Sequence, residues 1–136
     1  NVYVKADVRF EEADFSDADL LMIPGGMPGA KTLDEHDGVR NALLAHAKLG
    51  KLLGAICAGP MVLGHLGLLD GLRATCYPGF EGELKGATYT AQLVTVDGNV
   101  VTGKGPAAAF EYAFTLLSIL KGEKVVSDLR KGMMFE

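Results

Sequence analysis

The segment from Lys51 to His65, KLLGAICAGPMVLGH, limits the fold of this chain more than any other segment does. Residues 52–56 form a nearly continuous apolar run, which is typical of a strand buried on both faces of a parallel sheet. Periodicity alone also allows a buried helix. Cys57 ends the run, and apolar residues resume after Ala58, Gly59 and Pro60. The pattern therefore predicts a strand, a tight turn and a helix, with the cysteine on the turn.

A cysteine on such a turn is a candidate nucleophile. In hydrolases with a nucleophile elbow, small residues allow a sharp turn that exposes the reactive side chain at the top of the sheet. The unpaired N–H groups and the dipole at the start of a helix favour the thiolate, which is the nucleophilic form. The alternative is a structural cysteine, because free cysteine is among the most buried residue types. Position alone leaves both interpretations of Cys57 open.

The composition indicates one globular α/β domain spanning residues 1–136, with 49% hydrophobic residues and 18 glycines that lie mostly at the ends of apolar runs. A net charge of -4 without a lysine or arginine cluster argues against nucleic-acid binding. No apolar run approaches the roughly 20 residues of a membrane span, and no signal peptide opens the chain. Two cysteines beside a self-sufficient core predict free thiols in a reducing compartment, by default the cytoplasm.

The N-terminal half shows three further patterns. Apolar and polar residues alternate over residues 2–10, which predicts a strand or hairpin with one solvent-exposed face. A second buried strand is predicted over residues 20–23. Thr32 and Glu35 have the spacing of a capping box, and apolar residues at helical intervals from Val39 onward predict a covering helix that ends near Gly50.

The C-terminal half begins with a short predicted strand over residues 73–77. Valines on both sides of Asp97 and Gly98 predict a β-hairpin. Pro106 suits the first turn of a helix that runs to residue 121, where Gly122 stops it. Because apolar residues surround a narrow polar stripe, we expect this helix to be buried on most sides, in the core or against another subunit. Residues 125–129 are expected to form a shorter helix or an edge.

Two other features bear on function. The turn at residues 24–29, PGGMPG, follows a predicted strand at the edge where open α/β sheets place their sites, and its glycines allow backbone N–H groups to approach a ligand. It lacks phosphate-loop spacing, so a plain tight turn is the alternative. His46 lies on or beside an apolar helix stripe and is expected to be a packing residue. His36 and His65 have no partner at metal-ligand spacing, so we expect no metal and no cofactor.

Three motifs, in this order, resemble the ThiJ/PfpI superfamily, and in particular the branch that includes the Parkinson-disease-associated protein deglycase: DADLLMIPGGMPGA, GAICAGP and VDGNVVTGKGPAAAFEYAFTLL. The resemblance implies a flavodoxin-like three-layer sandwich with a mostly parallel sheet, and a homodimer. It places the reactive cysteine of the family on Cys57 and two backbone donors on Gly26 and Ala58. The same resemblance implies that Gly25, Tyr77 and Pro78 line the pocket around this cysteine.

The chain departs from the family pattern at three points. Peptidase-like members carry a histidine directly after the nucleophile, and Ala58 stands there instead. Tyr77 occupies the apparent place of a histidine of the deglycase branch, and a phenol is a poor base near neutral pH. The family glutamate that bonds the cysteine lies on the first helix, upstream of this sequence. We therefore expect the natural chain to extend upstream by about 30 to 50 residues, one βαβ unit that the sheet otherwise lacks.

The resemblance implies an enzyme that acts on small carbonyl compounds. In this interpretation Cys57 attacks a 2-oxoaldehyde, or its adduct with an amine or thiol, and forms a hemithioacetal, as in a glyoxalase or deglycase. The alternative is a redox-sensing or stress-response protein without turnover, in which Cys57 is oxidised. A peptidase or amidase is a minor alternative, since the Cys-His dyad is not available.

Overall fold

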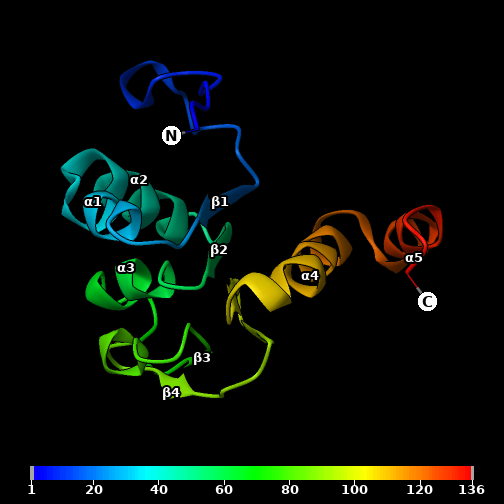
Figure 1. Cartoon of the computed structure of the whole chain (residues 1–136). Helices are drawn as coiled ribbons and strands as arrows, with labels where there is room; N and C mark the ends of the chain where they lie inside the picture. Colours follow the sequence, from blue (N-terminus) through cyan, green and yellow to red (C-terminus); the bar gives the residue numbers. More distant parts are fainter. Residues whose placement is uncertain (1, 136) are drawn as a thin grey trace.

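A mostly parallel sheet forms the centre of the computed structural model, which describes residues 2–135 (Figure 1). The strand order is β1-β2-β6-β5; β1, β2 and β6 run parallel, and β5 pairs antiparallel with β6. Both predicted buried strands and the predicted hairpin are confirmed. The strands of this sheet are β1 (Leu20–Ile23), β2 (Leu52–Ile56), β5 (Val94–Asp97) and β6 (Val100–Gly103).

Helices lie on the connections between the parallel strands, as expected for crossover connections, and two more α-helices follow the last strand. The α-helices are α1 (Gly29–Glu35), α2 (Asp37–Lys48), α3 (Pro60–His65), α4 (Ala109–Lys121) and α5 (Glu123–Gly132). Short 3-10 turns are η1 (Phe10–Glu12), η2 (Glu81–Glu83) and η3 (Pro106–Ala108). A separate parallel pair joins β3 (Arg73–Ala74) to β4 (Thr88–Tyr89), so the strand predicted over residues 73–77 is shorter than expected.

The central sheet buries different side chains on its two faces, because successive residues of a strand point to opposite sides. Leu53 belongs to a core that includes Leu43 of α2 and Leu63 of α3. Leu52 belongs to a second core, with Tyr112 and Leu116 of α4. In Figure 1, α1, α2 and α3 lie to one side of the strands and α4 lies to the other. The α/β fold class and the flavodoxin-like three-layer arrangement are confirmed.

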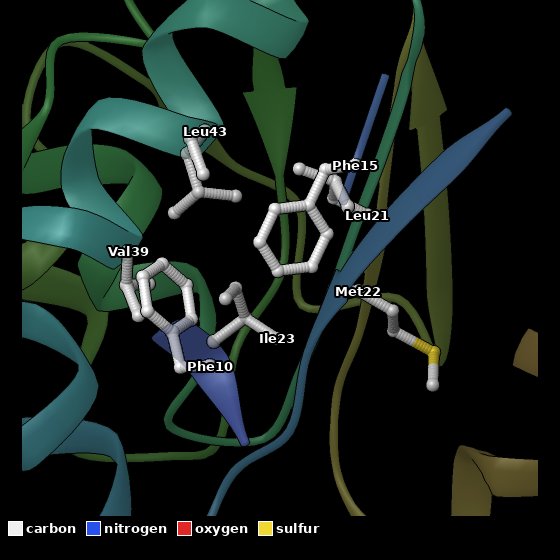
Figure 2. Close-up of a pocket in the computed structure, with 8 residues that line it drawn as sticks. Phe10, Phe15, Leu21, Met22, Ile23, Val39 and Leu43 are labelled. Carbon is white, nitrogen blue, oxygen red and sulfur yellow. The ribbon is translucent and has the colours of Figure 1, made fainter. Parts of the chain in front are cut away.

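Side chains alternate along β1 in the same way, and residues of this strand line a small apolar cavity of about 170 Å³. Figure 2 shows Leu21 and Ile23 on the side of α2, whereas Met22 points the other way. Two rings of the N-terminal segment, Phe10 and Phe15, close over this cavity with their centroids 5.4 Å apart. Its lining is entirely apolar and contains none of the residues expected at the candidate site: Phe10, Phe15, Leu21, Met22, Ile23, Val39, Ala42 and Leu43.

The strand or hairpin predicted for residues 2–10 is wrong. Residues 2–9 form no strand, and Val2 and Tyr3 are more than 90% exposed. A strand is stabilised by pairing with a neighbour, and no strand of the described chain lies beside this segment. Only Phe10 at its end is well packed, with its ring centroid 4.9 Å from that of His36.

The capping box predicted at Thr32 and Glu35 is also wrong. Thr32 lies inside α1, where its hydroxyl donates to the backbone oxygen of Pro28 at 3.3 Å. The N-cap of the following helix α2 is His36, whose Nδ1 accepts a hydrogen bond from the Val39 N–H at 3.1 Å. The helical segment therefore starts earlier than predicted, at Gly29, and is interrupted at His36. There the imidazole nitrogen satisfies one of the free N–H groups at the start of the second helix.

The helix predicted over residues 106–121 is confirmed as η3 followed by α4, and Gly122, with a φ of 90°, ends it. The single chain covers only part of this helix, so the expected burial on most sides, in the core or partly against another subunit, remains a prediction. Tyr112 and Leu116 are buried, but Phe110 is 53% exposed and Ile119 is 48% exposed. The apolar stripe is wider than the area that the sheet and α5 cover. None of the described helices is long and apolar enough to cross a bilayer.

The homodimer remains a prediction, motivated by the apolar composition of α4. Sedimentation velocity of the full-length protein at micromolar concentration should show a species of twice the chain mass, because burial of exposed apolar surface drives association. A single monomeric species over that concentration range would contradict the prediction.

Candidate active site

Cys57 lies on the turn between β2 and α3, in a backbone conformation that is rare for a residue with a side chain. Its φ is 64°, in the left-handed region. Two hydrogen bonds hold it: its N–H donates to the Gly103 carbonyl and its own carbonyl accepts from the Tyr77 N–H, each at 2.9 Å. Such a strained strand-to-helix turn is the geometry of a nucleophile elbow. The turn predicted at Cys57 is confirmed, and α3 begins at Pro60.

The turn after β1 packs directly against this elbow because Gly25 has no side chain. A Cβ on Gly25 would lie 2.4 Å from the Cβ of Cys57 and 2.9 Å from the backbone nitrogen of Ala58. Contacts that short do not occur, so glycine is required here. The next residue, Gly26, has a φ of 89°, which glycine adopts without strain. The structure thus brings Gly25, Gly26 and Ala58 together with Cys57.

The two backbone groups expected to act as donors have no hydrogen-bond acceptor in the described chain. Within residues 2–135, neither the Gly26 N–H nor the Ala58 N–H donates to a protein acceptor. The Ala58 side chain points into a small buried cluster with Ala30 of α1 and Met61 of α3, and Phe80 packs against this cluster. The position that carries a histidine in peptidase-like members is therefore occupied here by a buried methyl group, 2% exposed.

Tyr77 and Pro78 lie on the loop that follows β3, beside the elbow. The backbone of Tyr77 bonds Cys57, and its ring packs on Gly105, where a Cβ would lie 3.1 Å from Cδ2 of the ring. Both residues line a cavity of about 170 Å³ that Leu93, Lys104 and residues 105–108 complete, and neither Cys57 nor Gly25 lines it. Sequence reasoning missed Gly103 and Gly105 as neighbours of the site. The run TGKGP in the third motif was the signal that could have identified them.

The second cysteine has a different environment. Cys76 is fully buried, and both cysteines are free thiols. Burial, together with the negative charges of Glu81 and Cys57, raises the pKa of Cys76 to about 11. Its thiolate fraction is therefore small near neutral pH, and the thiol is a poor nucleophile.

The three histidines all have partners of their own. His46 is 3% exposed and its Nε2 lies 3.1 Å from the Leu52 carbonyl, so the expectation that it is a packing residue is confirmed. His36 caps α2, and His65 contacts the carboxylates of Asp34 and Glu83. No set of three or more metal-ligating side chains comes together anywhere in the described part of the chain.

Comparison with known proteins identifies the family of this chain. Residues 1–119 match the DJ-1/PfpI family. The chain is a member of the DJ-1/PfpI family. The crystal structure of Drosophila melanogaster DJ-1beta superposes with a TM-score of 0.93 at 30% identity, covering 99% of this chain and 74% of that protein. The resemblance to the ThiJ/PfpI superfamily is confirmed.

Several relatives in the DJ-1/PfpI family carry functional names. A glutathione-independent glyoxalase of Caenorhabditis elegans is 35% identical over 129 residues, which is 93% of this chain and 68% of the relative. A deglycase of Pyrococcus abyssi is 31% identical over 120 residues, 87% of this chain and 72% of the relative. Two Arabidopsis thaliana proteins named DJ-1 homologs B and A, 34% and 35% identical, are much longer, and the chain spans only 31% and 32% of their lengths.

The first prediction from this site concerns thiol reactivity. Alkylation with iodoacetamide near neutral pH should label Cys57 at least about tenfold faster than Cys76, because Cys76 is buried and mostly protonated. Peptide mass mapping over a time course measures both rates in one sample. A Cys57→Ala variant, in which early labelling should disappear, is the control. Faster labelling of Cys76 would rule out this assignment.

The second prediction concerns Gly25. The Gly25→Ala variant should lose about 1–3 kcal/mol of stability, because the added methyl forces the turn and the elbow apart. Gly29→Ala is the matched control: a Cβ there meets nothing within 4 Å, and its effect should stay within about 0.5 kcal/mol. Urea denaturation of both variants gives the comparison. Equal stabilities would show that the close contact is absent in solution.

Proposed function

We propose that this chain carries the site of a cysteine-dependent glyoxalase or deglycase-like enzyme that acts on 2-oxoaldehydes or their adducts. The observation that supports this most is the left-handed elbow at Cys57 with the unpaired N–H groups of Gly26 and Ala58 beside it. Membership of the DJ-1/PfpI family and the names of two relatives, a glyoxalase and a deglycase, support the same class of chemistry.

The first step uses the cysteine. The Cys57 thiolate attacks the aldehyde carbon of a 2-oxoaldehyde, a carbon–sulfur bond forms, and the electron pair of the carbonyl moves to its oxygen. In this proposal the Gly26 and Ala58 N–H groups donate to this oxyanion, which becomes the hydroxyl of a hemithioacetal on protonation. Donors fixed before the reaction stabilise the developing charge without reorganisation.

The later steps move a proton and consume water. A base removes the proton from the hemithioacetal carbon, and the same proton equivalent returns to the neighbouring carbon, which converts the ketone into an alcohol and the hemithioacetal into a thioester. Water then hydrolyses the thioester, releases a 2-hydroxy acid and regenerates the thiol. Each histidine already has a structural contact: His36 caps a helix, His46 lies in the core and His65 lies between two carboxylates. None of them is therefore assigned to this proton transfer.

Glycated amines or thiols fit the same scheme. An adduct of a 2-oxoaldehyde with an amine or a thiol is a hemiaminal or a hemithioacetal at the former aldehyde carbon. When the Cys57 sulfur replaces the amine or thiol there, a carbon–sulfur bond to Cys57 forms, the carbon–nitrogen or carbon–sulfur bond of the adduct breaks, and the amine or thiol leaves with a proton. The site at Cys57 is partly open, and Tyr77 beside it is 46% exposed. Access of this kind suits a substrate attached to a larger molecule.

Turnover of methylglyoxal tests this proposal. The full-length protein should convert methylglyoxal to lactate without glutathione, and Cys57→Ala should lower the rate by at least about 10³-fold, because the covalent step is lost. Cys76→Ala is the matched control and should keep the rate within about threefold, since its thiol plays no part in the scheme.

Two results would contradict the enzymatic proposal. Equal turnover by the wild-type protein and Cys57→Ala would show that the cysteine is not the nucleophile. Absence of turnover on both the free aldehyde and its adducts, combined with rapid conversion of Cys57 to a sulfinic acid by peroxide, would support the redox alternative instead.

A further inference from the structure

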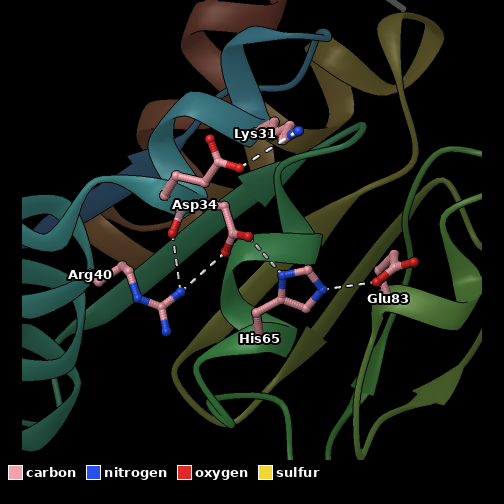
Figure 3. Close-up of polar contacts among 6 residues, drawn as sticks. Lys31, Asp34, Arg40, His65 and Glu83 are labelled. Carbon is pink, nitrogen blue, oxygen red and sulfur yellow. Dashed lines mark hydrogen bonds and ion pairs between the residues drawn. The ribbon is translucent and has the colours of Figure 1, made fainter.

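A histidine between two carboxylates joins three elements of the structure. Nδ1 of His65 lies 2.9 Å from Oδ2 of Asp34, and Nε2 lies 2.8 Å from Oε2 of Glu83, as Figure 3 shows. On the other side of Asp34, the Arg40 guanidinium lies 3.3 Å from Oδ1 and donates to the Asp34 backbone carbonyl at 3.1 Å. We call Asp34, His65 and Glu83 the carboxylate–histidine link. Arg40 fixes one of its ends.

Each member of the link belongs to an element that leads directly away from the candidate site. Asp34 is on α1, which follows the glycine turn at residues 24–26. His65 is the last residue of α3, which follows the elbow at Cys57. Glu83 ends η2, which follows the loop of Tyr77 and Pro78. The three segments around Cys57 thus continue into three elements that one imidazole connects.

Close packing transmits the position of these elements to the site. A Cβ on Gly64 would lie 2.2 Å from the Glu83 carbonyl oxygen, so α3 and η2 are in direct backbone contact. Nearer the site, Ala30 of α1 and Ala58 of the elbow share one cluster, against which Phe80 packs. A shift of α1 or η2 relative to α3 therefore moves the glycine turn or the Tyr77 loop relative to Cys57.

The protonation state of the imidazole decides whether the link is complete. A neutral imidazole has one N–H donor and one acceptor nitrogen, whereas an imidazolium has two donors. Asp34 and Glu83 both present carboxylate oxygens, so only the imidazolium satisfies both. In the neutral form one nitrogen lone pair faces a carboxylate, and that contact becomes repulsive.

The charges around the ring support the imidazolium. Partial burial opposes the charge, but the hydrogen bonds that the ring donates to Glu83 and Asp34, with the negative charges of these carboxylates, raise the pKa of His65 above its ordinary value. The other charged groups nearby are Arg40, which pairs with Asp34, and Lys85. The hydrogen bond from His65, and after it the charge of Lys85, lower the pKa of Glu83. The pair of Lys31 and Glu35 lies on the exposed side of α1.

We propose that His65 is a positioning residue, whose imidazolium form holds α1 and η2 against α3 and so fixes the two segments that flank Cys57. Because folding raises the proton affinity of this group, its stabilising contribution is complete below a pH of about 6.5 and is lost as the pH rises through the higher value of the folded state. The site is therefore held most firmly at mildly acidic pH. The effect on activity rests on the proposed function; the link itself does not.

Hydrogen exchange of the full-length protein tests the link without any substrate. At pH 6, the His65→Gln variant should exchange the amides of residues 27–36 and 79–86 at least about threefold faster than wild type, and the difference should vanish by pH 9. His65→Lys keeps a positive charge to higher pH and should retain at pH 9 the protection that wild type has lost. His36→Asn, which removes another histidine but preserves a helix cap, should match wild type throughout.

A second measurement connects the link to the site. In an active enzyme, His65→Gln should lower kcat/KM for methylglyoxal by at least about threefold at pH 6, with convergence at pH 9. If wild type has no turnover, the proposed function fails, and the rate of Cys57 alkylation at pH 6 replaces kcat/KM as the measurement. A threefold change in that rate would support the positioning role.

Three results would overturn the proposal. One is equal exchange in His65→Gln and wild type at pH 6. Another is a difference in exchange that does not vary with pH, because that would indicate packing without titration. The last is faster exchange in the variant with neither kcat/KM nor Cys57 alkylation changed, which would leave His65 as a structural residue only.

Discussion

The contact between the glycine turn and the cysteine elbow is the constraint on which the site depends. Strands β1 and β2 lie side by side in parallel, with Ile23 opposite Ala55, so their C-terminal ends meet at the same edge of the sheet. Two residues further on, Gly25 reaches the Cys57 Cβ at a distance that excludes any side chain. A single methyl group at this position would separate the backbone donors from the sulfur. The chemistry proposed for this protein therefore depends on one missing Cβ.

A third strand completes the arrangement. β6 lies on the other side of β2, and its last residue, Gly103, accepts the Cys57 N–H through its carbonyl. The three motifs that resemble the family are far apart in the sequence, yet each supplies the C-terminal end of one of these parallel strands. Open α/β sheets place their sites at this edge because strand ends and loops converge there without being covered by the crossover helices.

The three histidines make structural contacts away from the Cys57 sulfur. The cap at His36, the core contact of His46 and the link at His65 account for every histidine of the chain. The burial of Cys76 makes it a weak nucleophile, which supports the proposal that Cys57 is the nucleophile. The proposed site combines one thiol with unpaired backbone N–H groups, and this combination suits carbonyl addition, in which charge develops on an oxygen.

Local sequence patterns were sufficient to predict the elements whose signals lie within one segment of the chain. Apolar runs specify β1 and β2, the pair Asp97-Gly98 specifies the hairpin, and proline and glycine bound the helical segment from η3 to the end of α4. Tertiary structure alone decided the features that need a partner. Residues 2–9 alternate in the sequence but have no neighbouring strand to pair with in the described chain. The apolar stripe of α4 is wider than the surface that covers it. His65 contacts two carboxylates that lie 31 and 18 positions away in the sequence. Periodicity describes one segment at a time, whereas pairing, burial and charge depend on which segments the fold brings together.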